Sequence, residues 1–201
     1  MAKSPYDKAD IVIKYLSTKL MRLFSRTFAF DELNVINVSY EIYDEAYELI
    51  LREAARLTKT VYEMYLGEDA DAEGLGLDAL AFALAMAKAY NPVTKYVFEN
   101  ELDRKRAKFA EGVIATDTKE AEKAGHAQRL VRMTVQYIDD VTFAAGVQAL
   151  KDMGVKRVKW VTNVDDRRCP TCRSKHGKIF SIYDVPAKPH MGCRCWIEAV
   201  D

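Results

Sequence analysis

Cysteine is absent from the first 168 residues of this 201-residue chain, and all four cysteines lie between Cys169 and Cys195. Long apolar runs are also lacking, because the longest, Ala79 to Ala87, has only nine residues. A membrane-spanning helix needs about 20, so we expect none. The N-terminus has no basic segment followed by an apolar stretch and a cleavage site, so we expect no secretion. In a reducing cytoplasm, clustered cysteines bind metal more often than they form disulfides.

The chain as a whole has no net charge, because 30 Lys and Arg residues balance 30 Asp and Glu residues. The two ends differ: residues 1–150 carry 19 basic and 24 acidic side chains, whereas residues 151–201 carry 11 and 6. A basic end can mark a surface for nucleic acid or for an acidic partner. The excess of basic over acidic residues is modest, so we interpret most of these charged side chains as lying on a solvated face.

Helical periodicity dominates the first part of the chain. Ser4-Pro5 is a favourable helix start, and a helix is predicted over residues 5–24. A second helix is predicted from Tyr40 to Met64, with Gly67 at its C-cap. Its apolar stripe is typical of a bundle seam. A more specific alternative is that part of this stripe faces another subunit.

Two more helices follow in the sequence. The alanine-rich stretch LDALAFALAMAKAY suits close helix packing, and Asp117 with Glu120 resembles a capping box at the start of a long helix. This helix is predicted to run to about Met153 and to stop at Gly154. Its predicted apolar side consists of Leu130, Met133, Tyr137, Val141, Ala144 and Val147.

The cysteines form two chelating pairs. Cys169-Pro-Thr-Cys172 has the spacing that lets two thiolates bind one tetrahedral ion, and we expect it in a turn. His190-Met-Gly-Cys193 repeats that spacing, and Gly192 allows the tight backbone of such a zinc knuckle. The pattern predicts one structural zinc ion per chain.

Five candidate ligands compete for four positions. Cys169, Cys172, His190 and Cys193 are the first choice, and Cys195 could replace His190 or Cys193 because it shares a strand face with Cys193. A thioredoxin-like redox pair would need a helix after CPTC, where the sequence is hairpin-like. A cysteine nucleophile would need a base and an orienting group, and disulfides would need an oxidising compartment. His176 is interpreted as part of a turn with Gly177.

The pattern changes at Val155, where alternating residues predict a strand around Trp160, and KIFSIYDV and CWIEAV are predicted as further short strands. The predicted fold class is therefore mainly α with a small C-terminal β element: a helical bundle followed by a zinc-stapled α+β tail. We expect an N-terminal helical region, residues 1–115, and a second domain, residues 116–201, that contains the long helix and the Cys/His tail. The tail has few large apolar residues, so the ion decides whether it folds.

The two chelating pairs belong to a longer pattern, GVKRVKWVTNVDDRRCPTCRSKHGKIF followed by KPHMGCRCWI. This pattern resembles that of the phage minor head proteins related to protein F of bacteriophage Mu, and the resemblance extends from about Leu130 to Trp196. The matching positions are Gly154, Val155, Trp160, Asp166, Arg168, Cys169, Cys172, Gly177, Pro186 or Pro189, His190, Cys193, Arg194 and Cys195.

The resemblance implies a structural minor head protein of a tailed phage or prophage, acting in head assembly, DNA packaging or DNA delivery. It implies portal, coat or scaffold proteins as partners, and a place in the capsid interior or at the portal vertex after assembly in the host cytoplasm. We expect no membrane contact, no small-molecule substrate and no enzymatic activity.

The alternative function is a small zinc-binding module that contacts nucleic acid weakly and without sequence preference. Its candidate contacts are Arg167, Arg168, Arg173, Lys175 and Lys178.

Overall fold

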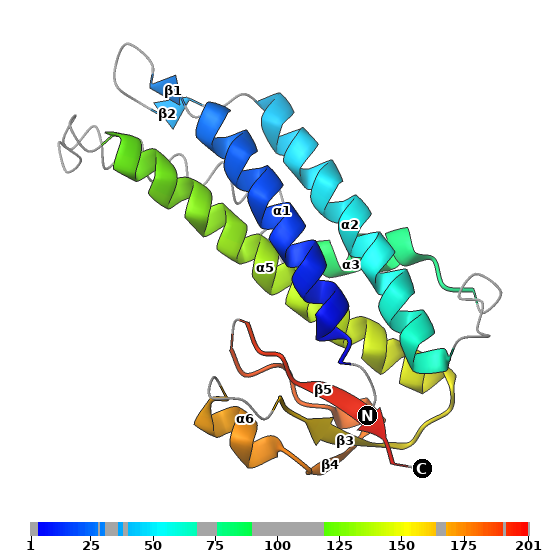
Figure 1. The fold of residues 1–201 in the computed structure, drawn as a ribbon. Coiled ribbons are helices and arrows are strands. Elements are labelled where there is room, and N and C mark those ends of the chain that lie inside the picture. The colour runs from blue at the N-terminus through cyan, green and yellow to red at the C-terminus, as the bar shows by residue number, and fades with distance from the viewer. Residues whose placement is uncertain are drawn as a thin grey trace.

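The computed structural model describes most of the chain, namely residues 4–27, 29–30, 36–37, 40–67, 76–89, 119–163, 168–190 and 192–200. Four of its helices form a bundle, and a small sheet with a short helix lies at one end of that bundle (Figure 1). The bundle helices are α1 (Tyr6–Thr27), α2 (Tyr40–Leu66), α3 (Ala79–Ala89) and α5 (Lys119–Asp152). Between α1 and α2, the two-residue strands β1 (Ala29–Phe30) and β2 (Ile36–Asn37) pair antiparallel.

Local sequence signals set several helix ends. The Ser4 hydroxyl accepts a hydrogen bond from the Tyr6 backbone N–H at 3.3 Å, as the predicted cap requires. Asp78 caps α3 in the same way, through a 2.9 Å bond from the Ala81 N–H to its carboxylate. Helix α2 ends at Leu66, directly before Gly67, as predicted. The proposed cap at Asp117 lies outside the described residues.

The C-terminal end of α5 directs the chain into the sheet. Gly154 has a φ of 76°, which favours glycine, and its N–H donates to the Lys151 carbonyl at 2.9 Å. The Val155 N–H donates to the Leu150 carbonyl at 3.0 Å. These two bonds form a Schellman motif, in which the side chains of Val155 and Leu150 also join one apolar cluster. The predicted stop at Gly154 is confirmed.

The bundle core is built from α1, α2, α3 and α5, and it contains most of the predicted α2 stripe. Ile50, Ala54, Leu57 and Val61 are all fully or almost fully buried inside the chain. The chain's own helices cover these four residues, so they do not face another subunit. For the rest of the stripe, that interpretation stays a prediction. The side chains of residues 40–43 lie outside the described ones.

Helix α5 contributes to two cores rather than one. Tyr137 and Val141 are buried in the bundle as predicted, but beyond them the bundle takes Ala145 and not Ala144. Val147 packs instead against the core of the tail, together with Phe143. A single predicted stripe fails here because the two faces of one helix meet two different partners.

The C-terminal tail, residues 155–200, is a three-stranded antiparallel sheet with one short helix. Strand β3 (Arg157–Val161) lies between β4 (Ile179–Ser181) and β5 (Trp196–Ala199). Helix α6 (Pro170–Lys175) lies between β3 and β4. The stretch predicted as one strand at KIFSIYDV is a strand only to Ser181, because residues Ile182–Asp184 form a 3-10 turn capped by the Ser181 hydroxyl.

Val158, Trp160 and Ile197 on the inner sheet face pack against Leu150 of α5, and buried cysteines complete this cluster. Tyr65 of α2 connects the two parts of the molecule, because its hydroxyl donates to the Ile197 carbonyl at 3.0 Å. The sheet therefore rests on the end of the bundle through α2 and α5.

The predicted fold class, mainly α with a small C-terminal β element, is confirmed. Within the described part of the chain, no helix is both long enough and apolar enough to cross a membrane. The predicted division between residues 1–115 and 116–201 falls among residues whose structure is not described, so it stays a prediction.

Candidate metal centre

The first cysteine pair lies at the start of α6 and not in a turn that leads into a hairpin, so that part of the prediction was wrong. Cys169 is the N-cap residue and Pro170 occupies the first turn, where its missing N–H costs no hydrogen bond. The Cys172 backbone N–H donates to the Cys169 sulfur at 3.2 Å. This bond holds the Cys169 Sγ over the first turn, where it and the Cys172 Sγ can bind the same metal ion.

The second pair lies on the segment that enters β5. His190 and Gly192 precede the buried Cys193, and Cys195 lies directly before Trp196, the first residue of the strand. Gly192 has a φ of 68°, which only glycine adopts freely, so the predicted tight backbone is confirmed. Cys193 and Cys195 are 1% and 2% exposed, as deeply buried as the apolar residues around them.

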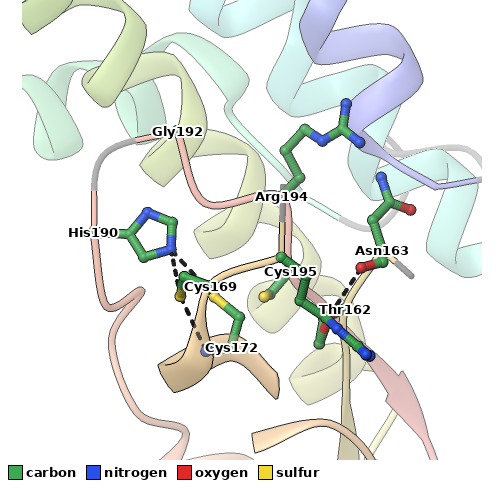
Figure 2. Close-up of a pocket in the computed structure, with 9 residues that line it drawn as sticks. Thr162, Asn163, Cys169, Cys172, His190, Gly192, Arg194 and Cys195 are labelled. Atoms are coloured by element: carbon green, nitrogen blue, oxygen red, sulfur yellow. Dashed lines mark hydrogen bonds between the residues drawn. The ribbon is translucent and has the colours of Figure 1, made fainter. Parts of the chain in front are cut away.

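The imidazole of His190 faces both sulfurs of the first pair (Figure 2). Its Nε2 lies 3.1 Å from the Cys169 Sγ and 3.3 Å from the Cys172 Sγ. The Cys172 Sγ lies 3.6 Å from the Cys193 Sγ. The two chelating pairs, about twenty residues apart in sequence, therefore meet at one point between α6 and the entry to β5.

These separations fit a tetrahedral metal ion. Ligand atoms about 2.0–2.3 Å from zinc, at tetrahedral angles, lie roughly 3.5–3.8 Å from one another. The measured distances of 3.1, 3.3 and 3.6 Å are only slightly shorter. Thiolate sulfur and imidazole nitrogen are also the donors that structural zinc sites use.

The five candidate ligands form two overlapping groups. Cys169, Cys172 and His190 make one, and Cys172, Cys193 and Cys195 make the other, with the ligand atoms of each group within 4.8 Å of one another. Cys172 belongs to both. The chain can therefore hold a metal ion here, and Cys172 is the candidate ligand that the two groups share.

Polar groups around the sulfurs favour negative charge at the site. The indole N–H of the buried Trp160 has no hydrogen-bond partner among the described residues. The bond with Cys193 and burial raise the pKa of the Cys195 thiol, and the Trp160 indole opposes this with a smaller effect. The Arg168 side chain lines the same pocket as Cys169 and Cys195, and its Nε is also unpartnered among those residues. Metal-bound thiolates would accept hydrogen bonds from such groups.

The pKa values of the thiols separate in the folded chain. Burial raises the pKa of Cys172 to about 12. A hydrogen bond from Cys195 lowers the pKa of Cys193 to about 5, and the pKa of Cys195 is raised by the same bond. The Cys172 N–H lowers the pKa of Cys169. At neutral pH, Cys172 and Cys195 therefore keep their protons unless a cation replaces them.

Zinc uptake by the metal-free chain should release protons. A thiol whose pKa is raised gives up its proton only when metal binds. The affinity for Zn²⁺ should therefore rise by about tenfold for each unit of increase in pH, for each such thiol that becomes a ligand. Calorimetry at pH 7 in two buffers of different ionisation enthalpy measures the proton count. Uptake without any buffer dependence would contradict this assignment of protonated buried thiols.

The structure separates His176 from the metal centre and weakens the redox interpretation. The His176 Nδ1 accepts a hydrogen bond from the Thr162 N–H at 3.2 Å, and this residue ends α6 before Gly177, as the turn prediction requires. CPTC does begin a short helix, but β3 and β4 are antiparallel, unlike the strands of the βαβ unit in thioredoxin-like proteins.

The sequence pattern did not reveal two residues that support the candidate metal ligands. Trp160 was treated only as a strand residue and as a position of the family pattern, although its indole N–H acts on the Cys195 thiol. Lys188 was given no role, although it precedes His190 by two residues and contacts the bundle. A single polar atom on an otherwise apolar strand face is the only sequence signal that could have identified Trp160.

The model of one protein family, described as phage Mu protein F like protein, matches residues 78–198. The chain belongs to this family. The match includes α3, α5 and the whole metal centre, and it begins further towards the N-terminus than the resemblance found in the sequence pattern. No curated protein and no solved structure matches the chain.

Membership of the phage Mu protein F like family indicates a protein of phage head morphogenesis. It implies contact with other head components and a place in the virion. Helices α1 and α2 lie outside the matched residues. The family therefore accounts for the long helix and the tail, and the N-terminal half of the bundle packs against them.

Proposed function

We propose that this chain is a structural minor head protein of a tailed phage or prophage, which associates with the portal vertex or the head shell and acts there in head assembly, DNA packaging or DNA delivery. The family match over residues 78–198 carries the proposal. The matched region contains both α5 and the complete Cys/His cluster.

The metal is proposed to be one structural zinc ion per chain. The donor set of sulfur and imidazole, and the short distances between donors, support zinc over the harder cations that prefer oxygen ligands. Within the tail core, three of the buried residues are cysteines: Cys172, Cys193 and Cys195. The ion thus supplies stabilisation that the small apolar core of so short a tail cannot supply.

The chain is proposed to act by binding and not by turnover. A structural zinc ion with four protein ligands has no open coordination position for a substrate. The cysteine sulfurs lie close to one another and to the His190 imidazole, as ligands of one metal ion do. A catalytic cysteine would instead need a base and a third group that orients that base. Partner surfaces are therefore the expected functional elements.

Co-expression with the cognate portal, coat and scaffold proteins tests the proposal. We expect the tagged chain to purify with the portal or with the head shell, through a contact that buries more than about 1,000 Å² and survives dilution. Recovery of the chain alone under every assembly condition would contradict the proposal.

Weak, sequence-independent DNA contact is the second candidate, and exposed Arg173 and Lys178 favour it. The other predicted contacts do not all contribute. Arg168 lines the metal pocket, and Lys175 lies 4.8 Å from the centre of the Trp160 ring. Arg167 lies outside the described residues. If DNA binding is real, reversing the charge of Arg173 and Lys178 together should lower both its affinity and its salt slope.

A further inference from the structure

The loop that carries His190 is attached to the N-terminal helix. The Lys188 ammonium donates to the Tyr6 hydroxyl at 2.7 Å and to the Asp139 backbone carbonyl at 3.3 Å. It also lies 4.3 Å from the centre of the Tyr6 ring. Lys188 therefore spans from the metal-ligand loop to α1 and α5 at once.

A second attachment lies between two of the candidate ligands. Arg194, between Cys193 and Cys195, places a guanidinium nitrogen 3.9 Å from the Asp10 carboxylate of α1. Figure 2 shows its side chain extending away from the sulfur atoms. Tyr6 and Asp10 lie four residues apart, so both attachments meet the same end of α1, which is the end nearest the sheet in Figure 1.

The partners of Lys188 are buried, whereas Asp10 in the second attachment is exposed. Tyr6 is 2% exposed and Asp139 3%, and burial raises the pKa of the Tyr6 hydroxyl well above its usual value, which keeps that hydroxyl a neutral partner of Lys188. A charged hydrogen bond in such surroundings is stronger than one on the surface. Neither Tyr6 nor Asp10 lies in the family-matched residues 78–198.

We propose that Tyr6 and Asp10 of the N-terminal helix, through Lys188 and Arg194, position the segment that carries His190, Cys193 and Cys195, so that metal binding and the docking of α1 stabilise each other. This rests on the proposed metal site.

The coupling follows from the geometry. Ligands on a mobile loop bind metal weakly because the loop must be ordered first. The contacts of Lys188 and Arg194 with α1 order the loop before the metal binds. By linkage, an ion that holds the loop in place also favours the position of α1, by the same factor. Lys188 and Arg194 are positioning residues in this scheme, since neither offers a lone pair to the metal.

The test uses the full chain loaded with Zn²⁺ alone. Lys188→Met keeps the length of the side chain but removes its charge and donors, and Tyr6→Phe removes only the hydroxyl and leaves the charge of Lys188. Lys178→Met in the same tail and Tyr15→Phe on the same helix are the controls, because Lys178 is exposed and Tyr15 is 42% exposed. Two quantities are measured: the rate of Zn²⁺ transfer to a competing chelator, and hydrogen exchange of the first turns of α1 with and without metal.

We expect Lys188→Met to transfer Zn²⁺ about tenfold faster and Tyr6→Phe about threefold faster than the unaltered chain. Both controls should stay within about twofold. Removal of Zn²⁺ should speed exchange in the first turns of α1 in the unaltered chain, and in Lys188→Met this exchange should be fast even with metal bound.

Stoichiometric Zn²⁺ binding, combined with unchanged α1 exchange on metal removal and ordinary transfer rates in both variants, would overturn the coupling and leave the metal site intact. A chain that binds no Zn²⁺ at all would overturn both.

Discussion

Replacement of Cys172 by serine should abolish metal binding and unfold the tail, residues 155–200. Cys172 is 4% exposed and is the one candidate ligand that both groups share, so its loss breaks both groups at once. Structural zinc contributes about 10–16 kcal/mol of apparent free energy in zinc-finger peptides. That is as large as the ~5–15 kcal/mol that stabilises a whole domain, and the apolar core of the tail cannot replace it.

The signature of this loss is regional. Cys172→Ser should bring hydrogen exchange in β3, β4 and β5 close to that of an unfolded chain, while far-UV circular dichroism retains most of the helical signal, because the bundle has its own core. Thr171→Ser, on the exposed side of the same short helix, is the matched control and should change neither metal content nor exchange. Normal protection of the sheet in metal-free Cys172→Ser would show that the ion is dispensable.

Loss of the metal should also abolish association with the phage head. The family match extends to residue 198 and so includes the tail, and an unfolded tail cannot present a fixed surface to a partner. We expect Cys172→Ser to fall to background in co-purification with portal, coat and scaffold proteins. Thr171→Ser should be recovered as well as the unaltered chain.

This second prediction has an informative opposite outcome. If Cys172→Ser remains fully associated with head components while its tail is unfolded, the binding surface lies on the helical bundle. The exposed Ile11 and Tyr15 of α1 would then be the first positions to replace.

Local signals in the sequence accounted for much of the fold. Ser4 and Gly154 act within one or two turns of their own helix ends, through bonds that depend only on neighbouring residues. The period of two around Trp160 predicted β3 for the same reason. The spacing of Cys169 with Cys172, and of His190 with Cys193, was enough to predict that the two pairs meet, and the structure brings them together in two overlapping groups of three.

Features that depend on distant neighbours were not predictable. The stripe of α5 divides after Val141 because the bundle and the tail approach different faces, and no local pattern encodes the second partner. Helix α6 was missed because six residues are too few for a period to appear. The contact between Lys188 and Tyr6 joins residues 182 positions apart, and a lysine in a loop carries no sign of its partner.

Mass spectrometry of purified procapsids and virions of the phage or induced prophage that encodes this chain tests the central claim, that the chain is a structural part of the head. The account predicts the intact chain in both particles, at low copy number relative to the coat protein, together with Zn²⁺ in amounts that match it. Absence of the chain from both particles, with coat and portal proteins present, would contradict the account.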